Sequence, residues 1–488
     1  MTYYLDPFGC VKNQVDAENM MAFLNRAGWV AAENADNADL IIINSCGFIE
    51  SAKQESINAV LNWRKLYPEK KILLAGCLAQ RYAKELAASL PEADGLFGVS
   101  DPAGIVRAAA LTVGTGPSEK RRGDPEPGAG GCPETGERPG VGEQPGVGDR
   151  PLLSLPGSAY VKISEGCNNR CSFCAIPLIR GGLRSRPVSE ISLECKTLLG
   201  RGIKELCLIG QDSGSYGRDL AAPGTDAAGA YLASDLSPGL PGLMEALSRL
   251  EGNFWVRPLY IHPDNFPQSV LSIMERDKRF LPYFDIPFQH GSEKILRLMN
   301  RRGNAAAYLD LIETIRSIFP DAAIRSTFMT GFPGETEEDF EMLLDFQKKA
   351  MLDWLGCFAY SREEDTQAWN IKGRVAKKIA LERKRLIEER QIPITEKRME
   401  RFIGRVFDVL VEEKFEAPAE DTSFNGNKVS NANKIYDETS LYLGRLPFQA
   451  PEVDGAAVIT SPKLLKTGEL ISCRVFARSG FDLQVRPV

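Results

Sequence analysis

Residues 164–174 read Ser164-Glu-Gly-Cys167-Asn-Asn-Arg-Cys171-Ser-Phe-Cys174 and run on into Ala-Ile-Pro-Leu-Ile-Arg180-Gly-Gly. Three thiols at this C-x3-C-x2-C spacing are typical of a metal or cluster site. A closed tetrahedral zinc site needs four protein ligands, and no Cys or His just downstream supplies a fourth. Three thiolates on a cubane leave one iron open, which favours a [4Fe-4S] cluster that binds a small molecule. An incomplete zinc knuckle and free thiols are the alternatives.

The same motif, with Phe173 before its last cysteine, resembles the radical S-adenosylmethionine (SAM) enzymes. The resemblance implies that Cys167, Cys171 and Cys174 are the cluster ligands and that the open iron chelates SAM. It also implies that an electron from the cluster cleaves SAM to methionine and a 5′-deoxyadenosyl radical.

The composition is that of a multidomain globular protein. The chain has 488 residues, 43% of them hydrophobic and 25% charged, which predicts roughly two to four domains. No secretory signal and no apolar run of ~20 residues is visible, so we expect a cytoplasmic protein without a membrane segment. Eleven Cys in such a protein favour metal-binding thiols over disulfides. A net charge of −6 argues against a general nucleic-acid binder.

The first 90 residues alternate strand and helix patterns, which predicts a parallel sheet with helices on its faces. We expect strands at 3–5, 40–43 and 71–75 and helices at 13–27, 50–66 and 79–90. Cys10, Cys46 and Cys77 each follow one of these strands. Strand ends of this kind line one crevice in open α/β sheets, so we expect the three thiols to converge and bind a second [4Fe-4S] cluster. Three unrelated buried cysteines are the alternative.

Two segments differ in composition from the rest. Residues 114–151 are rich in Gly, Pro, Glu and Arg and predict a flexible linker, within which Cys132 is given no role. Residues 214–239 are rich in Ala, Gly, Ser and Pro and predict a surface insertion.

A longer β/α series follows the linker. Strands are expected at 159–164, 204–209, 255–261, 283–286, 323–329 and 355–360, with helices at 189–200, 268–276, 305–318 and 336–349. Six strands fit a partial (β/α) barrel, and the cysteine motif follows the first of them, where barrel enzymes keep their catalytic groups. The family resemblance suggests Gln289, Arg325, Gly331 and Glu335 as SAM contacts. Gln289 and His290 face the same rim and His262 ends the third strand, although a lone His is more often structural.

The C-terminal part changes from helix to strand. Residues 375–401 predict a charged helix interrupted at Pro393. Short strand patterns at 407–411, 441–445, 456–459 and 470–476 then predict a small antiparallel β-barrel, which resembles a TRAM domain, an OB-like substrate-binding module.

Together these features resemble the radical SAM methylthiotransferases, which replace an unactivated C–H bond by C–S–CH3. The resemblance implies an α/β protein with an N-terminal doubly wound parallel sheet, a central partial (β/α)6 barrel and a C-terminal TRAM barrel. The implied segments are a methylthiotransferase domain at 1–113, a disordered linker at 114–151, a radical SAM domain at 152–400 and a TRAM domain at 401–488. The implied cofactors are two [4Fe-4S] clusters and SAM as co-substrate.

Two substrates compete within that family, namely tRNA adenosine and an aspartate side chain of small-subunit ribosomal protein uS12. Four stretches of the chain resemble the branch that modifies uS12 and gives 3-methylthioaspartate. They are Gly9-Cys-Val-Lys-Asn-Gln-Val-Asp16, Asn44-Ser-Cys-Gly-Phe-Ile-Glu-Ser51, Tyr160-Val-Lys-Ile-Ser-Glu-Gly-Cys167 and Asp285-Ile-Pro-Phe-Gln-His290. From residue 401 to 488 the chain has 11 Lys or Arg against 12 Asp or Glu. A near-neutral barrel suits a basic ribosomal protein better than RNA.

The expected partners are uS12 or the ribosome and an electron donor such as flavodoxin or ferredoxin, with the chain acting as a monomer. Two alternatives remain open from the sequence. One is a tRNA adenosine methylthiotransferase, which shares the chemistry and differs in its acceptor. The other is a non-catalytic iron–sulfur carrier.

Overall fold

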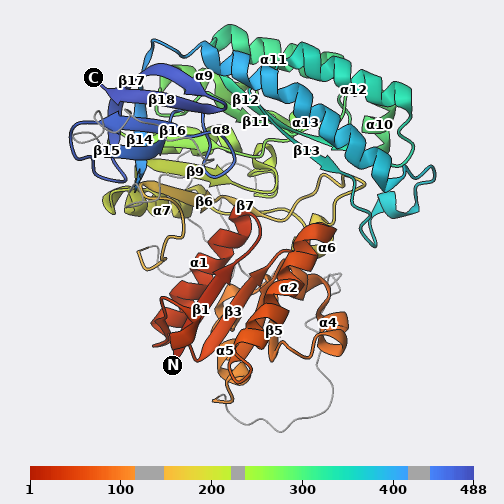
Figure 1. Cartoon of the computed structure of the whole chain (residues 1–488), viewed down its shortest axis with the longest axis vertical. Coiled ribbons are helices and arrows are strands. Elements are labelled where there is room, and N and C mark those ends of the chain that lie inside the picture. Colours follow the sequence, from red (N-terminus) through yellow and green to blue (C-terminus); the bar gives the residue numbers. More distant parts are fainter. Residues whose placement is uncertain (116–147, 221–236, 416–439) are drawn as a thin grey trace, which may run out of the picture.

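The computed structural model describes residues 1–115, 148–220, 237–415 and 440–488. The N-terminal sheet and its helices form one unit, which meets the central strands, while the C-terminal barrel packs beside those strands (Figure 1). Cys132 and most of the predicted linker and insertion lie outside the described residues. No helix in the described ranges is both long and apolar enough to cross a bilayer.

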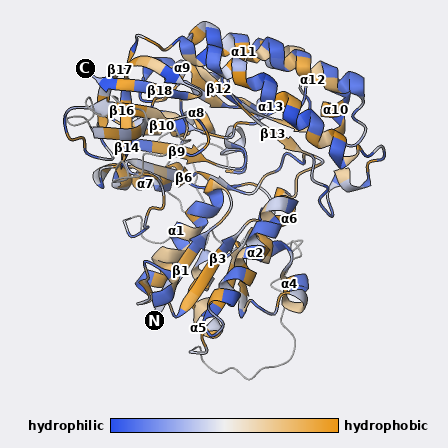
Figure 2. Ribbon diagram, viewed as in Figure 1, coloured by the Kyte–Doolittle hydropathy of each residue, from blue (hydrophilic) through white to orange (hydrophobic). Residues whose placement is uncertain are grey.

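The N-terminal unit is a five-stranded parallel sheet in the order β2-β1-β3-β4-β5. The strands are β1 (Thr2–Pro7), β2 (Val30–Ala31), β3 (Leu40–Ser45), β4 (Lys71–Gly76) and β5 (Gly95–Phe97). Helices α1 (Val11–Arg26) and α5 (Ile105–Thr112) pack on one face, and α2 (Glu50–Leu66), α3 (Cys77–Arg81) and α4 (Ala83–Ser89) pack on the other. Alternate side chains of β3 and β4 pack into the apolar layers on the two faces of the sheet. Because both of its faces are buried, β3 is among the most hydrophobic strands (Figure 2). The predicted doubly wound sheet is confirmed, although the helix predicted at 79–90 is two helices.

The central unit has six parallel strands in two groups of three, ordered β10-β9-β6 and β11-β12-β13. They are β6 (Ser158–Lys162), β9 (Glu205–Ile209), β10 (Trp255–Pro258), β11 (Tyr283–Asp285), β12 (Ala323–Thr330) and β13 (Trp354–Ala359). Backbone bonds such as Ile261 N to Asp285 O, at 2.9 Å, link the groups, so the strands follow chain order as in the predicted partial barrel. Its helices are α7 (Val188–Gly200), α8 (Leu240–Ser248), α9 (Ser269–Arg276), α10 (Glu293–Leu298), α11 (Ala305–Ile318) and α12 (Glu337–Ala350).

Helix α13 (Lys377–Glu400) is continuous through Pro393, so the predicted interruption is wrong. The side chains of Gln391 and Thr395, on either side of the proline, hydrogen bond to the backbone oxygens of Leu352 and Asp353 at 2.8 and 2.9 Å. These contacts hold the helix against the residues before β13 and offset part of the cost of the proline, which removes one backbone hydrogen bond.

The predicted small C-terminal barrel is confirmed; it is closed and five-stranded, in the order β14-β15-β16-β18-β17. Its strands are β14 (Val406–Phe415), β15 (Ser440–Arg445), β16 (Ala457–Ser461), β17 (Leu470–Ser479) and β18 (Asp482–Pro487). The last strand was not predicted. It pairs with β16 and β17 and buries Leu483 and Val485 completely.

A buried ion network joins the barrel to the central unit. Glu205 on β9 accepts from Arg257 Nε at 2.8 Å and pairs with Arg445 on β15. Arg445 also donates to Glu412 at 2.6 Å. The four side chains, named here the Glu205 network, leave at most 7% of their side-chain surface exposed.

Two predicted irregular segments begin or end in ordered structure. Residues Ser213–Ser215 form a buried turn, and Tyr216 is fully buried and donates to Arg186 O at 2.7 Å. The prediction that the insertion lies on the surface is therefore wrong for its first residues. At the end of the predicted linker, Arg150 is buried and pairs with Glu18 and Glu194 at 3.0 and 2.9 Å.

Candidate functional site

Cys10, Cys46 and Cys77 lie together at the carboxyl edge of the N-terminal sheet. Cys46 directly follows β3, Cys77 begins α3 directly after β4, and Cys10 immediately precedes α1. Strands β1, β3 and β4 are neighbours, so their ends meet. A Cβ atom added to Gly9 would lie 3.2 Å from Cys46 Cβ, which shows how closely the first two loops approach. We call these three cysteines the N-terminal set.

Asn13 ties the three loops together. Its Nδ2 donates to Ser45 O at 2.8 Å, and its Oδ1 lies 3.2 Å from Cys77 Sγ. Asn44 Nδ2 donates in return to Asn13 O at 2.7 Å. Gly76 has φ +101°, and a Cβ there would meet Ser45 O at 2.5 Å, so only glycine fits before Cys77.

Cys167, Cys171 and Cys174, the central set, occupy the loop between β7 (Ser164–Glu165) and α6 (Ile176–Arg180). The loop is fixed at both ends, because Cys167 N donates to Gly181 O at 3.1 Å and Cys174 N to Cys171 O at 3.0 Å. Phe173 anchors its middle in a small apolar cluster with Ile295, Met299, Phe332 and Ala368. The phenylalanine of the motif thus has a packing role.

Burial dominates the electrostatics of both sets. It raises the pKa of Cys77 and Cys174 to about 12 and that of Cys167 to about 11. Neighbouring thiols of the same set raise these pKa values further, so the members of each set lie within electrostatic range of one another. Thiolates are the ligands of iron, so cluster binding must displace these protons. None of the ten cysteines in the described ranges forms a disulfide.

The thiols of each set can each bind a different iron of a cluster. The described residues contain no group of three or more His, Cys, Asp or Glu side chains placed to bind one metal ion. A cubane gives each thiolate a different iron, so its ligands stand further apart than those of one ion. Each set offers three thiols, of which Cys77 is buried, Cys10 is exposed and the other four are half-buried, and three thiolates of this kind fit a [4Fe-4S] cluster with one open iron.

A buried ion cluster joins the two sets. Arg180, at the end of α6, donates from Nη2 to Cys77 Sγ at 3.1 Å and to Asp16 Oδ2 at 2.9 Å. Its Nη1 donates to Glu165 at 2.9 Å, and Lys162 pairs with both carboxylates. Arg180, Asp16, Glu165 and Lys162 form what we call the Arg180 cluster. The sequence analysis did not predict this cluster, although Arg180 follows soon after Cys174 in the chain.

Gly331 and Glu335 form a rigid turn after β12. The amides of Gly331 and Phe332 donate to Glu335 Oε2 at 2.8 and 3.2 Å, and Arg383 of α13 donates to Oε1 at 2.5 Å. Both oxygens of this fully buried carboxylate are thus engaged within the protein. Gly331 has φ +74°, and a Cβ there would lie 2.2 Å from Ala380 Cβ, so the turn packs tightly against α13.

The other predicted SAM contacts lie at the ends of β11 and on β12. Gln289 has φ +71°, and its buried Oε1 has no hydrogen-bond donor among the described residues. Such an unpaired buried acceptor fits a bound polar ligand. Arg325 pairs with Asp285 at 3.2 Å and with Asp454 of the C-terminal barrel at 3.7 Å.

The two histidines differ in their surroundings. His262 Nε2 lies 3.8 Å from Cys171 Sγ, beside the central set. His290 is fully buried. Its Nδ1 accepts from Ser292 N at 2.9 Å, and its Nε2 lies 3.6 Å from Glu335. His290 Nε2 has no hydrogen-bond partner among the described residues.

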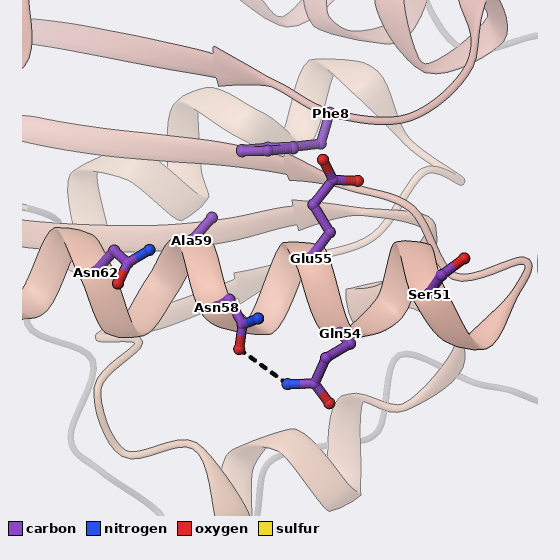
Figure 3. A pocket seen from close by; sticks show the side chains of 7 residues that line it. All are labelled: Phe8, Ser51, Gln54, Glu55, Asn58, Ala59 and Asn62. Carbon is purple, nitrogen blue, oxygen red and sulfur yellow. Dashed lines mark hydrogen bonds between the residues drawn. The ribbon is translucent and has the colours of Figure 1, made fainter.

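A separate pocket of about 510 Å³ lies along α2, with the Gln54–Asn58 hydrogen bond at its rim (Figure 3). Its lining residues are Phe8, Ser51, Gln54, Glu55, Asn58, Ala59 and Asn62. None of the six candidate ligands lines it.

The chain matches known families along most of its length. It matches the Uncharacterized protein family UPF0004 at residues 2–98, the Radical SAM superfamily at 161–346 and the TRAM domain at 432–488. A Ribosomal protein uS12 methylthiotransferase RimO from Treponema denticola is 45% identical over 98% of this chain and 99% of its own length. Proteins of the same name from Syntrophomonas wolfei and Clostridioides difficile are 36% and 35% identical, over 97% and 98% of this chain and 97% of their own lengths.

The three units and the central cysteine set define a radical SAM enzyme, which uses [4Fe-4S] clusters and SAM. With relatives this similar over their full length, the chain belongs to the RimO family of methylthiotransferases. The family and the three-unit architecture predicted from the sequence are therefore confirmed.

Proposed function

We propose that this protein replaces a C–H bond at the β-carbon of an aspartate of ribosomal protein uS12 by a methylthio group, giving 3-methylthioaspartate. One observation carries the proposal. Cys77 of the N-terminal set packs against Ala175 and Ile179, directly after the central set, and accepts a hydrogen bond from Arg180 of α6 at 3.1 Å. Radical formation and sulfur delivery need two adjacent sites, and the relatives named above carry this substrate in their names.

In this proposal Cys167, Cys171 and Cys174 hold the cluster that works with SAM, and Cys10, Cys46 and Cys77 hold the second cluster. When bound, these groups would supply three things: the sulfur atom, the methyl group, and the 5′-deoxyadenosyl radical that removes a hydrogen atom from the substrate. Gln289, Arg325, Gly331 and Glu335 bind or shape the SAM site. Gln289 Oε1 is an open acceptor, whereas Glu335 holds the turn and keeps Gly331 in place.

The chain's own residues position the two sets and exclude water from the junction. The Arg180 cluster fixes α6 against α1, with Arg180 exposing 1% of its side chain and Glu165, the most exposed member, 22%. Phe173 and Met299 seal one side of the central loop. Exclusion of water protects a radical from side reactions.

The remaining partners follow from the chemistry. Cleavage of SAM consumes one electron, so we propose a small redox protein such as flavodoxin or ferredoxin as the donor. The protein acts as a monomer in the cytoplasm, on uS12 or on the ribosome that carries it.

Anaerobic reconstitution with iron, sulfide, SAM and a reductant tests the proposal. We expect release of 5′-deoxyadenosine and a methylthio-modified aspartate on added uS12, with no modification of added tRNA. Modified tRNA and unmodified uS12 would instead assign the acceptor to tRNA adenosine. No release of 5′-deoxyadenosine from protein with both clusters loaded would leave an iron–sulfur carrier.

A further inference from the structure

Lys12 is a buried cation without an acidic partner. It lies in the first turn of α1, two residues after Cys10, and is only 7% exposed. Its Nζ stands 2.8 Å from the centroid of the Tyr260 ring, which follows β10. No carboxylate within the described ranges comes close enough to form an ion pair with it.

Other buried cations at the domain junctions are all paired. Arg180 contacts Asp16 and Glu165, Lys162 contacts the same two carboxylates, and Arg445 contacts Glu205 and Glu412. Burying a charge without a counter-charge is costly. An aromatic ring offsets that cost only in part. Lys12 is therefore placed to receive an anion that the described residues do not provide.

The surroundings of Lys12 belong to both catalytic units. Burial lowers the pKa of Lys12 to about 8, the charges of Cys10 and Asp285 oppose that shift, and those of Arg180 and Arg325 add to it. Asp285 is already engaged by Arg325 at 3.2 Å, and Arg325 also pairs with Asp454. The ammonium group thus lies between the N-terminal set and the ends of the barrel strands, and no carboxylate of the described residues forms an ion pair with it.

We propose that Lys12 binds the side-chain carboxylate of the substrate aspartate; this rests on the proposed function. The carbon that receives sulfur is bonded directly to that carboxyl carbon. A carboxylate held by Lys12 therefore brings the reacting carbon to the side of Cys10, beside the second cluster. The same contact selects an acidic side chain over a neutral one, because a lysine ammonium prefers a charged acceptor.

Binding of uS12 peptides to the reconstituted holoenzyme tests this inference. One peptide carries the target aspartate and the other carries asparagine at that position. We expect the wild type to bind the aspartate peptide about 10- to 100-fold more tightly, as a charge-assisted hydrogen bond allows. Lys12→Met should lose this preference, and Lys12→Arg should keep most of it. Iron content should be the same in all three proteins.

Lys53→Met is the matched control. Lys53 also lies over a tyrosine ring, that of Tyr82, but is paired with Glu50 and Glu363. It should keep the preference for the aspartate peptide. A wild type that binds both peptides equally would overturn the inference without any variant, as would a Lys12→Met protein that still discriminates or has lost iron. A wild type that binds neither peptide would overturn the proposed substrate together with the role of Lys12.

Discussion

Arg180 Nη2 donates to Cys77 Sγ across 3.1 Å, although the two residues are 103 positions apart in the chain. The bond connects the helix directly behind the central cysteine set to a member of the N-terminal set. The Arg180 cluster around this bond fixes how the N-terminal unit sits against the central unit. Charge-assisted contacts of this kind fix geometry as well as adding stability.

Arg180→Ala should destabilise the apo protein strongly. Removal of one partner from a buried ion cluster leaves Asp16 and Glu165 short of positive charge, at a cost of about 3–5 kcal/mol. Urea unfolding measures the loss. The control is Arg26→Ala, which removes an ion pair with Asp149 whose partners are 44% and 58% exposed and should cost about 0–1 kcal/mol. Equal effects of the two substitutions would contradict a structural role for the Arg180 cluster.

Single cysteine variants should separate the two proposed clusters. Cys46→Ala should lose about half of the iron, still release 5′-deoxyadenosine from SAM, and insert no sulfur, because only the second cluster is lost. Cys171→Ala should also lose about half of the iron but release no 5′-deoxyadenosine. Iron assays and chromatography of the nucleoside products check both results.

Cys195→Ala serves as the control, since Cys195 is fully buried in the core of the central unit and belongs to neither set. It should keep all of its iron. A Cys46→Ala protein that still forms the methylthio product would show that the N-terminal set is not the sulfur site.

The Glu205 network should make stability depend on pH in acid. Burial opposes ionisation of Glu205, but Arg445 and Arg257 outweigh it and lower its pKa from 4.5 to about 2. A lowered folded pKa stabilises the protein above pH 4.5, and the contribution disappears as the pH falls toward about 2. The total is on the order of 3 kcal/mol.

Comparison of wild type with Glu205→Gln isolates this effect, because Glu412, whose pKa is raised by burial, is common to both. The difference in unfolding free energy should be largest above pH 5 and should shrink below about pH 4.5. Urea unfolding of the apo proteins across this range measures it. A difference that does not change with pH would show that Glu205 is not ionised in the folded protein.

Gly331→Ala should disturb the proposed SAM site. The new methyl group would meet Ala380 of α13 at 2.2 Å, in addition to the strain of a positive φ. Gly202→Ala is the control, since Gly202 has φ +92° but open space around it. Both substitutions cost about 1–2 kcal/mol in backbone strain, but only Gly331→Ala should also weaken equilibrium binding of SAM. Equal SAM affinity in the two variants would remove the Gly331 turn from the site.

Local pattern predicted much of this molecule. The C-x3-C-x2-C spacing marked the central set, and the continuous apolar runs around 40–43 and 71–75 placed Cys46 and Cys77 at neighbouring strand ends. Strand ends of a parallel sheet meet by geometry, so convergence of these residues needs no knowledge of side-chain packing.

Long-range contacts could not be predicted in the same way. Arg180 and Lys12 are ordinary surface-type residues in the sequence, and only the folded chain shows that one is paired and the other is not. Pro393 is a local signal for a helix end, but Gln391 and Thr395 hold α13 through contacts with the residues before β13. Strand β18 was missed because Asp482–Pro487 is short and partly charged, and it is defined by the barrel that it closes.

The central claim is that this protein modifies uS12, and mass spectrometry of cells with and without its gene tests that claim most directly. In cells that have the gene, one aspartate of uS12 should carry a methylthio group in place of hydrogen. Deletion should remove that mass, and a plasmid copy with intact cysteines should restore it, whereas a copy with Cys46→Ala should not. Unchanged uS12 together with loss of methylthio groups from tRNA would contradict the account.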